Sequence, residues 1–507
     1  MKTNTLATHL NKTLGLAAIA ASAASFPLAA RAAAADAAPA PAQQTPNIVL
    51  VVADDFGWTD LGCTGSKYYE SPNIDRFAAQ GMRFTCSYTM PNCAPTRSCL
   101  WTGKYSPRTG IYTVGNSDRG KSYDRQLIPP KNITTLPLDI PTMPELIRGS
   151  GYMTAMYGKW HLGHDAEHGP AVRGFDDTVW YDGGSHFDFK PKPDRPHPKG
   201  QFLADFLADQ GIAFMRKARE AKKPFLLVIT HFAVHRPLQA PQAEIDHFKS
   251  KPTVGGHDNP IYAGMIRALD SSFGRVVKAL DDLGIADNTL IIFTSDNGGL
   301  TVPRTTDNAP LRGGKGMHYE GGVRVPFIAR WPGVIKPGAT CDTPIHVIDF
   351  IPTLLDILHR APATDTVLDG LSYLPLLKGQ PDKAIETRAL YWHCPVYLEG
   401  DKTVLWRSTP SDIIRQGPWK LIETYAPKEI ELYNLAADLS ETTNLAKQQP
   451  QLTAELLAKL HQWRDDLRGA MPVPNPDYHK ATASKNEKKN KKNKKTKVGE
   501  EGENLEE

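Results

Sequence analysis

Two apolar runs, each ending in oxygen-bearing residues and then glycine, most constrain the fold of this 507-residue chain. The run "NIVLVVADDFG" ends in Asp54 and Asp55, and "NTLIIFTSDNGG" ends in Asp296 and Asn297. A continuous run of β-branched apolar residues is typical of a strand that is buried on both faces. Both runs therefore predict interior strands of a sheet, with acidic or amide side chains at their carboxyl ends.

The segments between and after these runs predict an α/β fold. "PFLLVITHFAVH" (224–235) is a third strand pattern with His235 at its end, and "SPNIDRFAAQG" and "IRALDSSFGRVVKALDDLG" are helical patterns. Strands that alternate with helices predict a large, mostly parallel sheet sandwiched by helices, over residues 46–376. Ligands of such sheets bind beyond the carboxyl ends of the strands. Residues 377–472 contain short strand patterns and an amphipathic helix, which predict a small C-terminal α+β subdomain.

The two ends of the chain predict export and disorder. Lys2 and Lys12, a short apolar run and the segment Ala30-Arg31-Ala32 predict a signal peptide over residues 1–32, followed by an Ala/Pro linker over 33–45. We therefore expect a periplasmic or extracellular protein. Residues 473–507 form a charged tail that predicts disorder. The net charge of +4 gives no reason to expect a nucleic-acid partner, and no later run is long enough to span a membrane.

The residues at the two strand ends offer oxygen ligands. Asp54, Asp55, Asp296 and Asn297 supply three carboxylates and an amide oxygen, a set suited to calcium or magnesium rather than zinc. Adjacent residues of a strand point to opposite faces, so Asp54 and Asp55 can serve one centre only where the strand has ended. The alternative is that both pairs only form turns.

A second motif, "CAPTRSCLWTG", predicts an anion-binding helix start. Pro95 suits the first turn of a helix and Gly103 suits its end, which places Cys93 at the helix N-terminus. Backbone N–H groups there favour an anion, and Arg97 adds a permanent cation. The alternative is a capped helix with a buried thiol. The six cysteines are too scattered along the chain to form a compact disulfide framework.

The motif "CAPTRSCLWTGKY" resembles the C-x-P-x-R signature of type I, formylglycine-dependent sulfatases. These arylsulfatase-like enzymes belong to the alkaline phosphatase superfamily. The blocks "PNIVLVVADDFGWTDLGCTG", "GYMTAMYGKWHLG", "FAVHRPLQAP", "TSDNGG" and "LRGGKGMHYEGGVRVPFIARWPG" are also similar to family blocks and follow the family order. The resemblance extends from about residue 46 to about residue 467. Thr96 departs from the serine that is common at that position.

The resemblance implies a sulfatase that hydrolyses sulfate monoesters to an alcohol and inorganic sulfate. Cys93 would be oxidised to formylglycine by a formylglycine-generating or sulfatase-maturating enzyme, and the aldehyde hydrate would be the nucleophile. One calcium ion would be held by the set Asp54, Asp55, Cys93, Asp296 and Asn297. The catalytic residues implied are Cys93, Arg97, Lys159, His161, His235 and Lys315. The expected substrate is a sulfated small molecule or glycan, with His186 and His393 as candidate rim residues.

Two other functions fit parts of the sequence. A hydrolase of phosphate or phosphonate esters would share the metal-binding strand ends. A non-catalytic binder of sulfated glycans would keep the fold without turnover. The glycine-rich segment around Lys315 is not a nucleotide P-loop, because Lys315 is followed by glycine rather than Ser or Thr. His231 and His235 lack the H-E-x-x-H pattern of zinc proteases.

Overall fold

The computed structural model of the protein describes residues 45–181, 183–362 and 365–478. The predicted signal peptide, nearly all of the linker and most of the charged tail lie outside the described residues. Among the helices of the described part, none combines the length and apolar character that a membrane crossing requires.

The described residues form a central sheet of nine strands, in the order β10-β2-β8-β7-β1-β6-β4-β5, with β9 beside β2. β1 is parallel to β6 and β7, β4 is parallel to β5 and β6, and β8 is antiparallel to β2 and β7. The prediction of a mostly parallel sheet is confirmed. The strands are β1 (Asn47–Ala53), β2 (Met82–Tyr88), β4 (Met153–Lys159), β5 (Asp177–Tyr181), β6 (Phe225–Thr230), β7 (Thr289–Ser295), β8 (Arg324–Arg330), β9 (Ala339–Cys341) and β10 (Ile345–His346).

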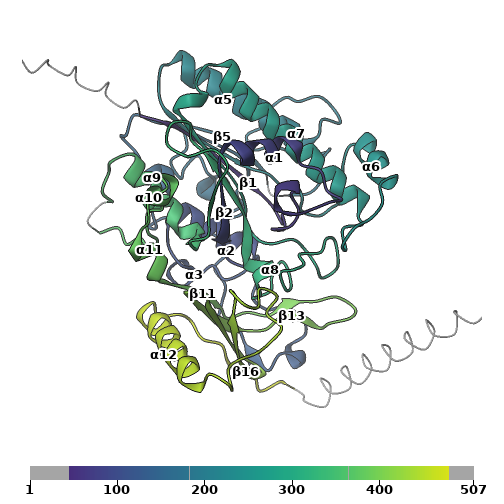
Figure 1. The fold of residues 1–507 in the computed structure, drawn as a ribbon, viewed down its shortest axis with the longest axis vertical. Coiled ribbons are helices and arrows are strands. Elements are labelled where there is room, and N and C mark those ends of the chain that lie inside the picture. The colour runs from purple at the N-terminus through teal and green to yellow at the C-terminus, as the bar shows by residue number, and fades with distance from the viewer. Residues whose placement is uncertain (1–44, 182, 363–364, 479–507) are drawn as a thin grey trace, which may run out of the picture. The chain divides into compact units, whose positions relative to one another are not determined.

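Helices cover both faces of this sheet, as the alternation of the sequence predicts (Figure 1). In β1, Val49 and Val51 pack into the core that contains α1 (Pro72–Gln80), α5 (Leu203–Glu220) and α7 (Pro260–Asp282). Ile48, Leu50 and Val52 pack into the opposite core, which contains α2 (Cys93–Thr102), α9 (Phe350–Ile357) and α10 (Leu374–Leu377). Every residue of β1 is buried, because both of its faces contact a core.

A smaller antiparallel sheet follows, in the order β11-β14-β15-β16, and α12 packs against it. This confirms the predicted C-terminal α+β unit. Its elements are β11 (Ala389–Cys394), β14 (Ser411–Gln416), β15 (Trp419–Tyr425), β16 (Lys428–Asn434) and α12 (Pro450–Asp466). A separate hairpin of β12 (Leu398–Glu399) and β13 (Trp406–Ser408) comes between β11 and β14 in the sequence. The shorter helices are α3 (Ser106–Thr109), α4 (Met143–Leu146), α6 (Gln242–Lys249), α8 (Glu320–Val323) and α11 (Lys383–Thr387).

Both predicted limits of the C-terminal subdomain need correction. Leu377 and Ile385 pack into a core of the main sheet, so the subdomain starts near residue 388 rather than at 377. At the other limit, β17 (Val473–Pro474) pairs with β3 (Leu127–Ile128), and the Asn475 side chain is buried. The first residues of the predicted tail are therefore part of the fold, because a backbone ladder and a buried amide hold them.

Candidate active site

The carboxyl ends of β1 and β7 bring two pairs of oxygen-bearing side chains together. Asp54 and Asp55 follow β1, Asp296 and Asn297 follow β7, and these parallel strands are in register up to their last residues. The Asp55 backbone N–H donates to Asp296 Oδ1 over 3.2 Å. Asp55 has a left-handed backbone, with φ of 60°. This turn ends the alternation of the strand, so that Asp54 and Asp55 both contact the next group, Cys93.

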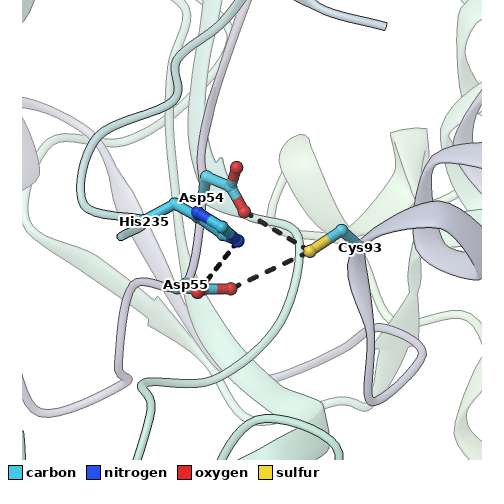
Figure 2. Close-up of side chains that lie close together, drawn as sticks. All are labelled: Asp54, Asp55, Cys93 and His235. Atoms are coloured by element: carbon cyan, nitrogen blue, oxygen red, sulfur yellow. Dashed lines mark hydrogen bonds and ion pairs between the residues drawn. The ribbon is translucent and has the colours of Figure 1, made fainter. Parts of the chain in front are cut away.

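Cys93 is the first residue of α2, as predicted from the positions of proline and glycine. The Asn92 side chain caps the helix by accepting from the Cys93 N–H over 3.0 Å, and Gly103 ends it with φ of 65°. The thiol Sγ lies 3.5 Å from Asp54 Oδ1 and 3.9 Å from Asp55 Oδ1 (Figure 2). Burial raises the pKa of the Cys93 thiol well above its usual range, so the unmodified side chain is a neutral thiol and a poor nucleophile.

Three cations neutralise the carboxylates. Arg97 donates from Nε and Nη2 to Asp296 Oδ2 over 3.0 and 2.8 Å. Lys159 Nζ lies 2.5 Å from Asp54 Oδ2, and Lys315 Nζ lies 2.7 Å from Asp55 Oδ1. Because all of these side chains are nearly or fully buried, each charge requires its partner.

The carboxyl groups differ in their affinity for a proton. Burial alone would raise the pKa of Asp55, but Lys315, His235 and Lys159 hold it well below its usual range. For Asp296, burial and the nearby Asp54 carboxylate raise the pKa to about 6, against the effect of Arg97. Asp55 is therefore the firmly ionised member of the group, whereas Asp296 more readily accepts a proton.

His235 lies beyond the end of the third strand rather than on it. β6 ends at Thr230, but the chain stays beside the end of β1, because the backbone of Ala233 and Val234 exchanges hydrogen bonds with that of Asp54. The ring Nδ1 lies 2.5 Å from the Arg236 carbonyl oxygen, which assigns the proton to Nδ1, and Nε2 lies 3.8 Å from Asp55 Oδ2. Burial and the charge of Lys159 lower the pKa of His235 to about 3, so its imidazole is neutral in the free protein.

His161 occupies the loop directly after β4, with φ of 66°. Lys159, by contrast, is the last residue of β4. Burial and the charge of Lys159 lower the pKa of His161 well below its usual range. Its Nδ1 is buried and has no hydrogen-bond partner among the described residues. The left-handed turn after β4 places His161 on the same cavity as Cys93.

The acidic residues fit a hard cation. Asn297 Oδ1 is buried and, within the described part of the chain, accepts no hydrogen bond, which leaves an oxygen free to bind a metal. Ligand atoms of Asp54, Asp55, Cys93 and His235 lie within 4.8 Å of one another (Figure 2). The sequence did not suggest that His235 would lie in this group.

A cavity of about 170 Å³ adjoins the charged residues. Cys93, His161, His235 and Lys315 line it. Three further charged side chains that the sequence did not single out also line it: Arg119, Glu399 and Arg407. Arg119 belongs to the loop after α3, whereas Glu399 and Arg407 belong to the hairpin β12–β13.

The two histidines expected at the rim are instead buried. His186 is 1% exposed, and its Nε2 lies 3.0 Å from the His235 backbone carbonyl, so it supports the loop of His235. His393 is 0% exposed, with Nδ1 2.6 Å from Asp412 Oδ1 and Nε2 3.0 Å from the Ala470 carbonyl. Both positions differ from the expected rim, because each ring is enclosed by the core and holds backbone or carboxylate partners.

Comparison with known proteins agrees with this geometry. Residues 46–360 match the sulfatase family, and residues 314–468 match the C-terminal region described as N-sulphoglucosamine sulphohydrolase, C-terminal. A sulfatase of Formosa agariphila is 34% identical over 83% of this chain and 88% of its own length. The N-acetylgalactosamine-6-sulfatase of Canis lupus familiaris is 34% identical over 67% of each chain. The crystal structure of Ps i-CgsB in complex with k-i-k-neocarrahexaose is 28% identical, with a TM-score of 0.71 over 88% of this chain and 98% of that chain.

The site and these matches together define a hydrolase of sulfuric esters. The chain belongs to the sulfatase family, whose match covers most of the described residues. The family match also selects among the functions that the sequence left open, in favour of sulfate-ester hydrolysis.

Proposed function

We propose that this protein is an exported sulfatase that removes sulfate from carbohydrates, with formylglycine made from Cys93 and one calcium ion. The observation that carries the proposal is the position of Cys93, at the N-terminus of α2 and within 4 Å of Asp54 and Asp55. The carbohydrate substrate is supported by relatives, one named for an N-acetylgalactosamine-6-sulfate and one crystallised with a carrahexaose. The sequence of residues 1–32 supports export.

Formylglycine and calcium would supply the nucleophile and the divalent charge that the unmodified side chains do not provide. As an aldehyde hydrate, the proposed formylglycine would supply one hydroxyl to attack sulfur as the alcohol leaves, and a second hydroxyl whose deprotonation would break the carbon–oxygen bond to sulfate and restore the aldehyde. Asp54, Asp55, Asp296 and Asn297 would hold the calcium, which offers positive charge to the oxygens of the sulfate. A serine or threonine nucleophile has only one hydroxyl, so after its attack on sulfur it would remain as a stable sulfate ester.

The surrounding residues then take distinct roles. Arg97, Lys159 and Lys315 surround the carboxylates with fixed positive charge, so they stabilise the negative charge that develops on the sulfate oxygens. Asp296 is the residue that we assign to accept the proton of the attacking hydroxyl. His161 accepts the proton of the second hydroxyl.

His235 is the proposed acid for the departing alcohol, together with Lys315. The imidazole is neutral in the free protein, and its Nδ1 proton is engaged by the Arg236 carbonyl. It must therefore take up a proton on Nε2 when the sulfate is bound. A bound anion favours that protonation.

The central experiment measures inorganic sulfate released by protein matured in a host with a formylglycine-generating enzyme. The expected result is an aldehyde at Cys93 by peptide mass spectrometry and turnover of both aryl and carbohydrate sulfates. Cys93→Ala should lower kcat/KM by about 10³-fold or more, with an unchanged melting temperature. Faster turnover of phosphate than of sulfate monoesters by the matured protein would refute the proposal, as would sulfate release by the alanine variant at the wild-type rate.

A second experiment tests the acid role of His235. His235→Ala should lower kcat for unactivated carbohydrate sulfates by about 10²- to 10⁴-fold, because their alcohols need a proton in order to leave. The loss should be far smaller for an activated aryl sulfate, whose phenolate leaves without help. Equal losses on both kinds of substrate would contradict the acid role and would point to metal binding or positioning.

A further inference from the structure

The cavity beside Cys93 contains a cation that neither the proposed reaction nor the metal site uses. Arg407 lies on β13, and its Nη1 donates to the backbone carbonyls of Val302 and Lys315 over 3.3 and 3.4 Å. Its Nε is buried and has no partner within the described residues. Arg407 also makes no ion pair with any carboxylate of the described chain. A partly buried guanidinium without a carboxylate has donors to offer to a ligand.

Arg119, the other arginine of the cavity, differs because it has an acidic neighbour. Arg119 Nη1 lies 3.8 Å from Glu399 Oε2, and the Gly120 N–H donates to Glu399 Oε1 over 2.9 Å. The Glu399 side chain is also 51% exposed, so solvent shares its charge. Glu399 thus pairs with Arg119 and shares its charge with solvent. The charges of Asp55 and Glu399 also act on Arg407, but neither carboxylate of the described chain lies within ion-pair distance of its guanidinium.

The charges around the reacting centre already balance without Arg407. The three carboxylates of Asp54, Asp55 and Asp296 face the three cations Arg97, Lys159 and Lys315. The proposed calcium would then offset the single negative charge of a sulfate ester with charge to spare. Arg407 is therefore not needed to neutralise the sulfate that reacts.

We propose that Arg407 binds a second anionic group of the substrate, a carboxylate or a further sulfate on the same saccharide. This inference rests on the proposed function and adds the substrate class, a saccharide with at least two negative charges. The guanidinium is suited to both groups, because its planar fork matches the oxygens of a carboxylate or a sulfate. The position on the β12–β13 hairpin means that the C-terminal part of the chain recognises the substrate, while the main sheet carries the chemistry.

The test compares matched saccharides for the wild type and for Arg407→Met. The set contains a disaccharide whose only charged group is one sulfate, the same disaccharide with a uronic acid added, and the same disaccharide with a second sulfate. For the wild type, kcat/KM should be higher for the doubly charged members, mainly through KM. In Arg407→Met, the ratio of kcat/KM for the doubly charged members to kcat/KM for the singly charged member should fall by about 10- to 100-fold, the effect of losing one charge-assisted hydrogen bond. Arg407→Lys should restore part of that ratio.

Several outcomes separate this inference from the proposed function. Arg304→Met is the control, because Arg304 pairs with Asp258, is 54% exposed and is not among the lining residues of the cavity; it should leave the ratio unchanged.

If kcat/KM of the wild type is the same for the singly charged sugar as for the doubly charged ones, the second anionic site is refuted and the sulfatase stands. Equal losses on all three sugars in Arg407→Met would also refute it, and would assign Arg407 to the reacting sulfate. If the wild type releases no sulfate from any ester, the proposed function itself fails. Which doubly charged sugar responds more strongly identifies the group as a carboxylate or a sulfate.

Discussion

Two buried clusters of charge in this protein contain the same kinds of residue, yet only one is built to bind a ligand. At the carboxyl edge of the main sheet, Asp54 and Asp55 pair with Lys159 and Lys315. That cluster adjoins a cavity, and it includes the unpartnered oxygen of Asn297. Its hydrogen bonds are incomplete until something binds.

The second cluster joins α8 to the C-terminal sheet, and we call it complete because each of its carboxylate oxygens has a hydrogen-bond or ion-pair partner. Glu441 Oε1 accepts no hydrogen bond within the described residues, but it pairs with Lys420. Lys420, on β15, lies 2.9 Å from Glu320 Oε1 and 2.8 Å from Glu441 Oε1, and all three side chains are fully buried. Tyr88 donates to Glu320 Oε2 over 2.7 Å, and the Glu320 N–H donates to Glu441 Oε2 over 2.7 Å. Buried charge therefore does not by itself mark a functional site. The cluster at the sheet edge differs because Asn297 Oδ1 has neither a hydrogen-bond nor an ion-pair partner among the described residues, and because a cavity adjoins the cluster.

The largest expected effect concerns the complete cluster. Lys420→Met removes the cation between two buried carboxylates and should lower the free energy of unfolding by about 3–5 kcal/mol. Chemical denaturation measures this loss. Lys459→Met is the matched control, because Lys459 is 41% exposed and pairs with Glu455 on the same helix, so its loss should stay below about 1 kcal/mol. Similar losses for the two variants would show that the buried cluster does not stabilise the fold.

The next effect concerns the incomplete cluster. Calcium at about 100 times its dissociation constant should raise the free energy of unfolding of the chelator-treated protein by about 3 kcal/mol. Asn297→Ala removes the unpartnered oxygen and should weaken this stabilisation, as titration of the melting temperature with calcium would show. A calcium response of the same size in Asn297→Ala would exclude Asn297 from the metal site.

The smallest effect is a pH dependence in the complete cluster. Burial and the neighbouring Glu320 raise the pKa of Glu441 from 4.5 to about 7, against the effect of Lys420. A raised pKa in the folded state stabilises the fold fully below the unfolded pKa, and that contribution is lost as the pH rises through 7. The wild type should therefore lose on the order of 2 kcal/mol relative to Glu441→Gln between pH 4.5 and pH 7.

Denaturation curves of the two proteins across this pH range test the prediction. Glu455→Gln serves as the control, because Glu455 lies on an exposed face of α12 with a 57% exposed side chain. A constant difference between wild type and Glu441→Gln at all pH values would contradict the raised pKa.

Much of the fold and part of the site follow from local sequence patterns. The buried runs fix β1 and β7, and the residues after each run meet because parallel strands in register end at one edge of the sheet. Proline and glycine likewise locate α2, and with it Cys93 at the helix start. These features are predictable because each depends on neighbours within about ten residues in the chain.

The remaining part of the site depends on contacts between distant segments. No motif surrounds Arg119 or Arg407, and they meet in one cavity only because the β12–β13 hairpin reaches the edge of the main sheet. The rim prediction for His393 failed to foresee its burial for the same reason, since Asp412 comes from the neighbouring strand β14. His235 was placed on a strand because the apolar pattern continues past the last ladder pair at Thr230.

The burial of Cys93 also bears on whether its proposed oxidation comes before or after folding. Its side chain is 1% exposed, and the residues of α2 around it are all buried. A modifying enzyme needs the segment around its target in its own active site, and the finished fold does not offer that segment. The oxidation proposed for Cys93 must therefore precede the closure of α2 into the core, so a chain that folds before it is oxidised would remain inactive however long the modifying enzyme is supplied afterwards.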